Sequence, residues 1–328
     1  MSHPAELLLD LTLSPTDAVS RPGLHHSLGQ TVVEFDRFTR THMQRISNVE
    51  FSPHALTHID LPDSVGLSPQ KPMGKGIPGT REWLWCEAVI VNLLSKREFL
   101  KEYFADLRWP ISFHDLPIIR ERLSARQTRE RLRTGLRIPK RTLSQIAKRN
   151  GGFREKLVIL HTGWDYFVPR STELGHPFWV GLHPYFLFPY LPEEAAEFLV
   201  DSGALGVGMD TASAEPPEWM WRLNPLLREH LGEAARRERG FGPVHRRLLG
   251  RRVAVIENLS IPVSVYGKKP DPSSFAALFR SRRGWVQPAS VDGKVLVIPF
   301  IMSPQREAVV VKVYFRSNAW QGEGESHG

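Results

Sequence analysis

The segment YLPEEAAEFLVDSGALGVGMDTAS, residues 190–213, contains a predicted helix that leads directly into a predicted buried strand. Pro192 stands where a first helical residue should, and two glutamates follow it at the positive end of the helix dipole. Gly203 marks the end of the helix. The apolar run that follows predicts a buried strand ending at Asp210 and Thr211. A helix joined to a buried strand in this way is typical of α/β proteins.

Strands and helices alternate along the rest of the chain. Apolar runs predict further strands at residues 6–14, 83–95, 156–163, 251–262, 293–302 and 308–315. The last two are expected to pair with each other. Helical spacing predicts helices at 96–107 and from about residue 112 into a basic segment.

No long linker divides the chain, so we predict one α/β domain spanning residues 1–328. We expect two insertions in this domain. One is basic and covers about 118–154, and the other is rich in proline, serine and arginine and covers about 268–292.

The net charge of +8 is concentrated in one segment. Residues 120–156 hold 13 lysines and arginines against three glutamates, a local net charge of +10. Such a segment can bind nucleic acid or another anionic partner. It contains neither interleaved aromatic residues nor a nucleic-acid motif. We therefore expect a solvated, arginine-rich insertion and no nucleic-acid partner.

The cysteine count and the hydropathy pattern exclude several classes of protein. Cys86 is the only cysteine, so internal disulfides and cysteine-based zinc sites are impossible. No apolar run approaches 18 residues, so no membrane span is expected. The first residues lack the basic region of a secretory signal, and we therefore predict a cytoplasmic protein.

The stretch SPHALTHIDLPDS, residues 52–64, places His54, His58 and Asp60 within seven residues. Flanking prolines argue against a helix, and β-branched residues favour an extended backbone. Alternate side chains of an extended chain share a face, so these three should lie together. Two imidazoles and a carboxylate suit zinc or manganese and leave positions open for water. The alternative is three unrelated polar residues near a turn.

The pattern H-x-x-T-H-x-D-x-P in this stretch resembles the signature of the metal-dependent cyclase family, which includes bacterial kynurenine formamidase and isatin hydrolase. That family usually reads H-x-G-T-H-x-D-x-P-x-H. Four other blocks resemble the family in the expected order: DLT at 10–12, LVILHTGW at 157–164, the segment at 190–213, and HRRLLGRRVAVIENL at 245–259. Together the five blocks extend over most of the chain outside the two insertions.

The resemblance implies an α/β, swivelling β/β/α-type fold with a barrel-like mixed sheet and peripheral helices. It implies one or two divalent ions, zinc or manganese, held by His54, His58, Asp60, His245 and Glu257. The implied activity is hydrolysis of a C–N bond in a small cyclic amide, formamide or aryl amide by metal-activated water. The implied assembly is a homodimer or homotetramer, with a small molecule as substrate.

Two positions depart from the family pattern. Leu56 replaces a glycine, which implies a reshaped or narrower pocket. Ser64 replaces the histidine that is the candidate proton shuttle, and serine does not titrate near neutrality. Proton transfer could then pass to Asp63, or to His161 or His183, so the candidate catalytic residues are Ser64, Asp63 and His161. Alternatively, the protein retains its metal without the usual hydrolysis, as a biosynthetic tailoring cyclase or dehydratase or as a binding or assembly module.

Overall fold

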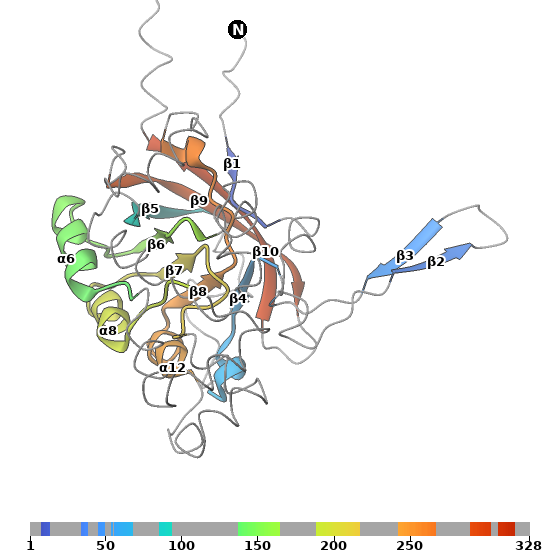
Figure 1. Cartoon of the computed structure of the whole chain (residues 1–328), viewed down its shortest axis with the longest axis horizontal. Helices are drawn as coiled ribbons and strands as arrows, with labels where there is room; N and C mark the ends of the chain where they lie inside the picture. Colours follow the sequence, from blue (N-terminus) through green and yellow to red (C-terminus); the bar gives the residue numbers. More distant parts are fainter. Residues whose placement is uncertain are drawn as a thin grey trace, which may run out of the picture.

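A mixed β-sheet that closes on itself forms the centre of the protein (Figure 1). The computed structural model describes residues 8–13, 34–38, 45–49, 54, 56–67, 85–93, 137–164, 188–216, 242–266, 289–302 and 308–318. Seven strands form the ring in the order β10-β4-β8-β7-β6-β5-β9, and pairing of β9 with β10 closes it. The α/β class and the barrel-like mixed sheet are therefore confirmed.

The strands of this sheet vary from two to thirteen residues in length. Their bounds are β1 Leu9–Asp10, β4 His58–Asp60, β5 Cys86–Asn92, β6 Lys156–His161, β7 Gly206–Met209, β8 Ala254–Glu257, β9 Ser290–Met302 and β10 Ala308–Ser317. The eighth strand, β1, pairs with β10 outside the ring. A separate antiparallel pair consists of β2 (Glu34–Phe38) and β3 (Arg45–Val49).

Four neighbouring strands, β5 to β8, run parallel and carry the core of the domain. Most of their side chains are apolar and buried, as expected for strands covered on both faces. Gly208 of β7 allows this packing, because a Cβ there would lie 2.8 Å from Leu259 and 3.3 Å from Ile159. The parallel direction brings the carboxyl ends of these strands to one edge, where His161 and Glu257 are found.

The C-terminal hairpin β9–β10 was predicted as a strand pair, and the pairing is confirmed. The first four residues of β10 are all buried, and beyond them burial alternates, with Val313 and Phe315 turned toward the core. Gly293 of β9 lies directly against Phe315 of β10. A Cβ at position 293 would be 2.2 Å from the carbonyl oxygen of Arg316, which only glycine avoids.

Three described helices lie along one side of the barrel: α6 (Lys140–Arg149), α8 (Glu193–Asp201) and α12 (Pro243–Gly250) (Figure 1). The helix α8 follows Pro192 as predicted, and it contacts both α6 and α12. The helix α12 was not predicted. The described residues also contain two short 3-10 helices, η2 (Pro62–Val65) and η6 (Val263–Tyr266). None of the described helices has the length and apolar character needed to cross a membrane.

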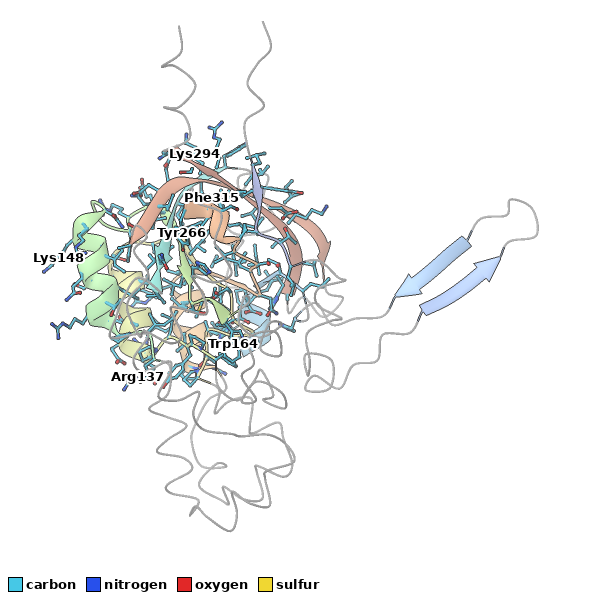
Figure 2. The ribbon with its side chains drawn as sticks, turned by 45° about the horizontal axis from the view of Figure 1, so that its top comes forward. Arg137, Lys148, Trp164, Tyr266, Lys294 and Phe315 are labelled. Carbon is cyan, nitrogen blue, oxygen red and sulfur yellow. The ribbon has the colours of Figure 1, made fainter. Side chains whose placement is uncertain are left out.

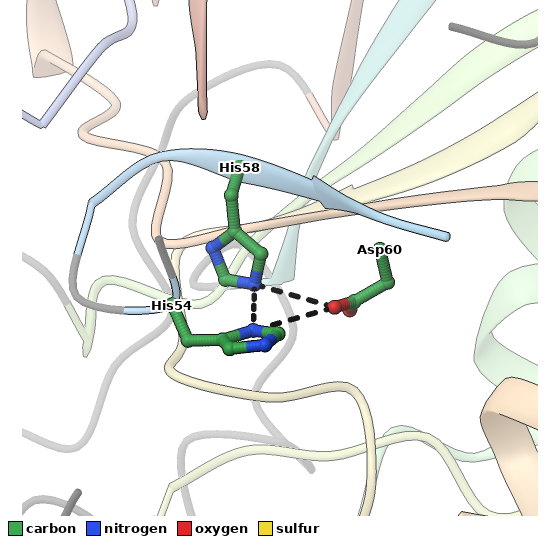
Figure 3. A group of neighbouring side chains, drawn as sticks. All are labelled: His54, His58 and Asp60. Carbon is green, nitrogen blue, oxygen red and sulfur yellow. Dashed lines mark hydrogen bonds and ion pairs between the residues drawn. The ribbon is translucent and has the colours of Figure 1, made fainter. Parts of the chain in front are cut away.

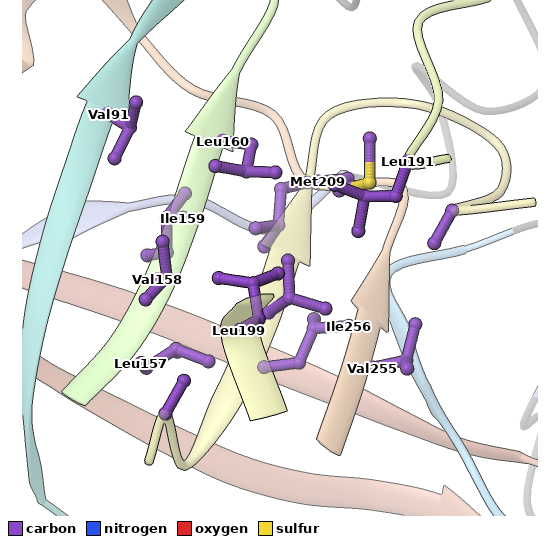
Figure 4. Close-up of a cluster of buried hydrophobic side chains, with 14 of the residues drawn as sticks. Val91, Leu157, Val158, Ile159, Leu160, Leu191, Leu199, Met209, Val255 and Ile256 are labelled. Atoms are coloured by element: carbon purple, nitrogen blue, oxygen red, sulfur yellow. The ribbon is translucent and has the colours of Figure 1, made fainter. Parts of the chain in front are cut away.

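The packing between helices and sheet buries a continuous apolar cluster (Figure 4). Leu199 of α8 belongs to it together with Leu160 of β6 and Met209 of β7, which are register partners on adjacent strands. Each fully buried side chain of this size contributes about 1.5–3 kcal/mol relative to exposure. The cluster therefore provides a rigid base for the strand ends.

Part of the predicted basic insertion, residues 137–154, belongs to the described structure. Leu143 and Ile146 of α6 are buried in the core, whereas Lys148 is exposed (Figure 2). The basic side chains of this segment thus lie on the outer side of a core helix. Most of both predicted insertions, and the helices predicted at 96–107 and from residue 112, lie outside the described residues. Their extents, and the single domain, stay predictions.

Candidate metal centre

The strand β4 and the turn before it bring His54, His58 and Asp60 together (Figure 3). His58 and Asp60 are two residues apart on the strand and therefore point to the same side. His58 Nε2 lies 2.9 Å from His54 Nδ1 and 3.5 Å from Asp60 Oδ1. His54 Nδ1 lies 3.4 Å from the same carboxylate oxygen. The predicted juxtaposition of these three side chains is thus present in the structure.

A buried hydroxyl and an asparagine hold this turn in place. Thr57 Oγ1 donates to the carbonyl of Asn258 at 2.6 Å and accepts the backbone N–H of Leu13 at 2.7 Å. Asn258 has a left-handed backbone with φ 57°, which asparagine tolerates better than most residues. Its side-chain Nδ2 donates to the carbonyl of His54 at 2.8 Å. The turn is therefore fixed to the residue that follows Glu257.

His245 and Glu257 complete the cluster from elsewhere in the chain. His245 lies on α12, and its Nε2 is 2.9 Å from Asp60 Oδ2 and 3.1 Å from Glu257 Oε1. Glu257 ends β8, where its register partner on β4 is His58. Its Oε2 lies 3.6 Å from His58 Nε2. Asp60 thus contacts His54 and His58 through one oxygen and His245 through the other.

Leu56, at the family's glycine position, contributes its backbone to the site. Its carbonyl is 2.8 Å from Nδ1 of His58, so Nδ1 carries the proton and donates it. In the neutral ring the lone pair then sits on His58 Nε2, which faces His54 Nδ1 and the carboxylates of Asp60 and Glu257. The Leu56 side chain is buried in a small cluster with Leu13 and Val310. A narrower pocket stays a prediction.

Glu215 is part of the cluster, although no sequence pattern singled it out. Its Oε1 lies 3.0 Å from His245 Nδ1 and 2.7 Å from the backbone nitrogen of His245. The only available signal was its position in the loop after a buried strand, shortly after Asp210 and Thr211. Acidic residues in such loops often belong to sites.

A known protein family matches the part of the chain that supplies the first residues of this cluster. The family described as "Putative cyclase" matches residues 9–216, a range that contains His54, His58, Asp60 and Glu215. The chain belongs to the cyclase family. The match ends before His245 and Glu257, which this cyclase-family chain brings to the same place through α12 and β8.

Solved structures support the cyclase-family fold. Isatin hydrolase A from Ralstonia solanacearum is 14% identical, has a TM-score of 0.51, and aligns over 94% of this chain and 91% of its own. A predicted metal-dependent hydrolase from Bacillus stearothermophilus is 15% identical, has a TM-score of 0.50, and aligns over 94% of this chain and 97% of its own. Comparison with curated protein sequences finds no significant match. At these identities the likeness concerns the fold.

Three carboxylates are buried in the cluster of this cyclase-family protein, on Asp60, Glu215 and Glu257. Burial would raise the pKa of Asp60, but His58 and His245 hold it well below its usual value. Burial and the charge of Asp60 raise the pKa of Glu257. Three carboxylates buried in one cluster require positive charge beside them. The cluster is therefore built around a cation or around protonated histidines.

Two of the three imidazoles, those of His58 and His245, meet that demand when no metal is bound. Burial would lower the pKa of His245, but Glu257, Asp60 and Glu215 raise it well above its usual value. Burial would lower the pKa of His58 as well, yet Asp60 raises it overall. Because metal ligands must be deprotonated, a divalent ion would take the place of these protons.

The spacing of the donor atoms fits a divalent first-row metal. Imidazole nitrogens and carboxylate oxygens lie about 2.0–2.2 Å from zinc, which puts neighbouring ligand atoms about 3.0–3.5 Å apart. The separations observed here run from 2.9 to 3.6 Å. Two overlapping triads have all their ligand atoms within 4.8 Å of one another: His54, His58 and Asp60, and Asp60, His245 and Glu257.

His161 lies on the other face of the sheet. Ile159, Gly208 and Ile256 are register partners across β6, β7 and β8, so His161 shares their face and Glu257 does not. His161 is fully buried, and its Nδ1 is 2.6 Å from the hydroxyl of Tyr266. Burial lowers its pKa to about 3. This geometry gives no support to His161 as a proton carrier for the cluster.

The side chains of the other candidate proton carriers lie outside the described part of the structure. Asp63 and Ser64 lie in η2, which contacts α12, but their side chains are outside the described part of the structure. His183 lies wholly outside the described residues. Their roles stay predictions.

Proposed function

We propose that this protein is a metal-dependent hydrolase that cleaves a C–N bond in a small cyclic amide, formamide or aryl amide. The observation that carries the proposal is the pair of overlapping triads that share Asp60. Support comes from the cyclase family match and from two fold neighbours, one named isatin hydrolase A and one named a predicted metal-dependent hydrolase. A small-molecule substrate, a homo-oligomer and a cytoplasmic location belong to the same proposal.

The residues that would hold the ion are His54, His58, Asp60, His245 and Glu257. A divalent ion bound by these residues would supply a Lewis acid for a substrate carbonyl and a means of activating water. Zinc and manganese both suit nitrogen and carboxylate donors, and the shared Asp60 allows one ion or two.

The protein's own side chains set the protonation state of the site. His58 keeps its proton on Nδ1, where the Leu56 carbonyl accepts it, and so presents Nε2. Hydrolysis of a C–N bond also needs a group that delivers a proton to the leaving nitrogen. We propose Asp63 for this step, because Ser64 stands at the usual position and cannot titrate near neutrality.

A second candidate function follows from Ser64 itself. A cyclase-family protein without the usual proton shuttle could retain the metal and lack ordinary hydrolysis. It would then act as a tailoring cyclase or dehydratase, or as a binding or assembly module.

Elemental analysis of the purified protein tests the proposal. We expect one or two equivalents of zinc or manganese per chain in the wild type and a loss of metal in His58→Ala and Glu257→Gln. The matched control is Glu193→Gln, an exposed glutamate of α8, which should keep its metal. Thermal unfolding of each variant separates lost ligands from lost fold. A folded wild type that binds no divalent metal would refute both candidate functions.

Activity then separates the two candidates. The metal-loaded wild type is assayed against isatin and a series of formyl anilides. Turnover that disappears in His58→Ala supports the hydrolase. Full metal loading without turnover supports the second candidate.

A further inference from the structure

Glu215 makes an unusual pair of contacts with one other residue. Its Oε1 accepts both the backbone N–H of His245, at 2.7 Å, and the Nδ1–H of the same residue, at 3.0 Å. The side chain of Glu215 is buried, with 5% of its surface exposed. A single carboxylate oxygen therefore fixes the main chain and the ring of His245 together.

The backbone contact caps α12. Gly242 precedes the helix and has no side chain to cap it, so the first backbone N–H groups of α12 need acceptors from elsewhere. The N–H of His245 is one of these groups. Glu215 supplies the acceptor and places negative charge at the positive end of the helix dipole. The Glu215 carboxylate lies close to the start of α12, because a Cβ on Gly242 would be 3.4 Å from Glu215 Oε1.

The ring contact selects one tautomer. A carboxylate accepts only, so Nδ1 of His245 must carry the proton that it donates to Glu215. In the neutral ring the lone pair then sits on Nε2, the atom that faces Asp60 at 2.9 Å and Glu257 at 3.1 Å. A carboxylate behind a ligating histidine also makes the ring a stronger donor.

The position of Glu215 is itself fixed by short-range contacts. Its backbone N–H donates to Ser213 Oγ at 3.2 Å, and Thr211 Oγ1 donates to the carbonyl of Ser213 at 3.0 Å. The other carboxylate oxygen, Oε2, is buried and has no hydrogen-bond partner in the described structure. Both contacts with His245 are therefore made by the same oxygen, Oε1.

We propose that Glu215 is the positioning residue of the metal centre, which holds His245 in the Nδ1–H form and points its Nε2 at the ion. The inference rests on the proposed function, because it assigns Glu215 a role toward the same ion. Glu215 does not touch substrate or ion in this assignment and acts through His245.

The test compares Glu215→Gln, Glu215→Ala and Glu215→Asp with the control Glu193→Gln, which removes an exposed first-turn glutamate from α8. Zinc affinity is measured by competition with a chromogenic chelator. We expect a loss of about 10- to 100-fold in the alanine variant, as found for residues behind metal ligands. The glutamine variant keeps an acceptor oxygen and should lose less, and the control should match the wild type.

Nitrogen-15 NMR of the histidines in the zinc-loaded protein reads the tautomer directly. Zinc on Nε2 and a proton on Nδ1 of His245 are expected in the wild type, with that proton signal lost in Glu215→Ala. Zinc affinities of all three Glu215 variants within twofold of the wild type would overturn the inference.

Hydrogen exchange of the metal-free protein distinguishes a failure of the proposed function from a failure of the role assigned to Glu215. The backbone amide of His245 should be protected in the wild type and should exchange at least tenfold faster in Glu215→Ala. A wild type without metal, but with this protection, would refute the proposed function while the Glu215 contact stands. Equal exchange in wild type and variant would refute the Glu215 contact whatever the metal content.

Discussion

Replacement of Asp210 by asparagine should destabilise the fold by about 3 kcal/mol, because this buried carboxylate holds the chain where it leaves β6. Asp210 Oδ1 accepts the hydroxyl of Thr162 at 2.7 Å, and Oδ2 accepts the backbone N–H of Gly163 at 2.7 Å. The backbone N–H of Thr162 is shared between the two oxygens, at 3.1 and 3.0 Å. All of these groups are buried.

The magnitude follows from what asparagine can still accept. Its single oxygen can take the place of one carboxylate oxygen, and its NH2 group then faces donors. One buried backbone N–H, that of Gly163 or Thr162, is left without an acceptor at a cost of about 1–3 kcal/mol. The bonds that remain lose their ionic partner, which removes about 1 kcal/mol from each. Relief of the buried charge offsets part of this loss, which leaves about 3 kcal/mol.

Urea unfolding followed by circular dichroism measures the difference. Asp201→Asn is the matched control, because it makes the same chemical change at an exposed position at the end of α8 and should stay within about 0.5 kcal/mol of the wild type. An unfolding free energy for Asp210→Asn within 1 kcal/mol of the wild type would refute the view that this carboxylate organises the strand exit.

Three further changes have defined outcomes. Gly293→Ala should cost at least about 2 kcal/mol by urea unfolding, since its Cβ would meet the Arg316 carbonyl at 2.2 Å; a neutral result would contradict the tight β9–β10 packing. Thr57→Val keeps the shape but leaves the Leu13 N–H and Asn258 carbonyl unpaired, at a cost of about 2–4 kcal/mol, with Thr57→Ser as the control that retains both bonds. The pKa of His161 is lowered to about 3, so the unfolded chain binds an extra proton between pH 3 and 6.5. Acidification from pH 7 to 5 should therefore cost the wild type about 2 kcal/mol more than His161→Gln; parallel stability curves would contradict the burial of a neutral ring.

The elements that could be predicted from the sequence are those with strong local signals. The strand β6 is a continuous apolar run after a Gly151-Gly152 turn, and α8 has proline at its start and glycine after its end. Closure of the barrel had no such signal. It depends on pairing of β10 with both β9 and β4, and register between distant strands is set by packing rather than by local pattern.

The same distinction between local sequence signals and long-range packing applies to the residues of the candidate site. The spacing of His54, His58 and Asp60 was enough to bring them together, because they are neighbours on one extended segment. His245 and Glu257 could be proposed only through the family resemblance, since nothing local connects a short basic helix to a strand end. Glu215 was missed because its role depends on the start of α12, an element that was itself not predicted.

The pairing of β4 with β10 determines how early during synthesis the candidate site can assemble. The strand β4 is only three residues long, and β10 pairs with it through Ala308 and Val310, opposite Asp60 and His58. All five proposed ligands have been synthesised by residue 257, yet the strand that flanks two of them comes some fifty residues later. Contacts of such long sequence separation form late. A nascent chain that stops before β10 would carry every proposed ligand and still lack the strand that flanks two of them. We therefore expect the proposed metal loading to follow the synthesis of β10.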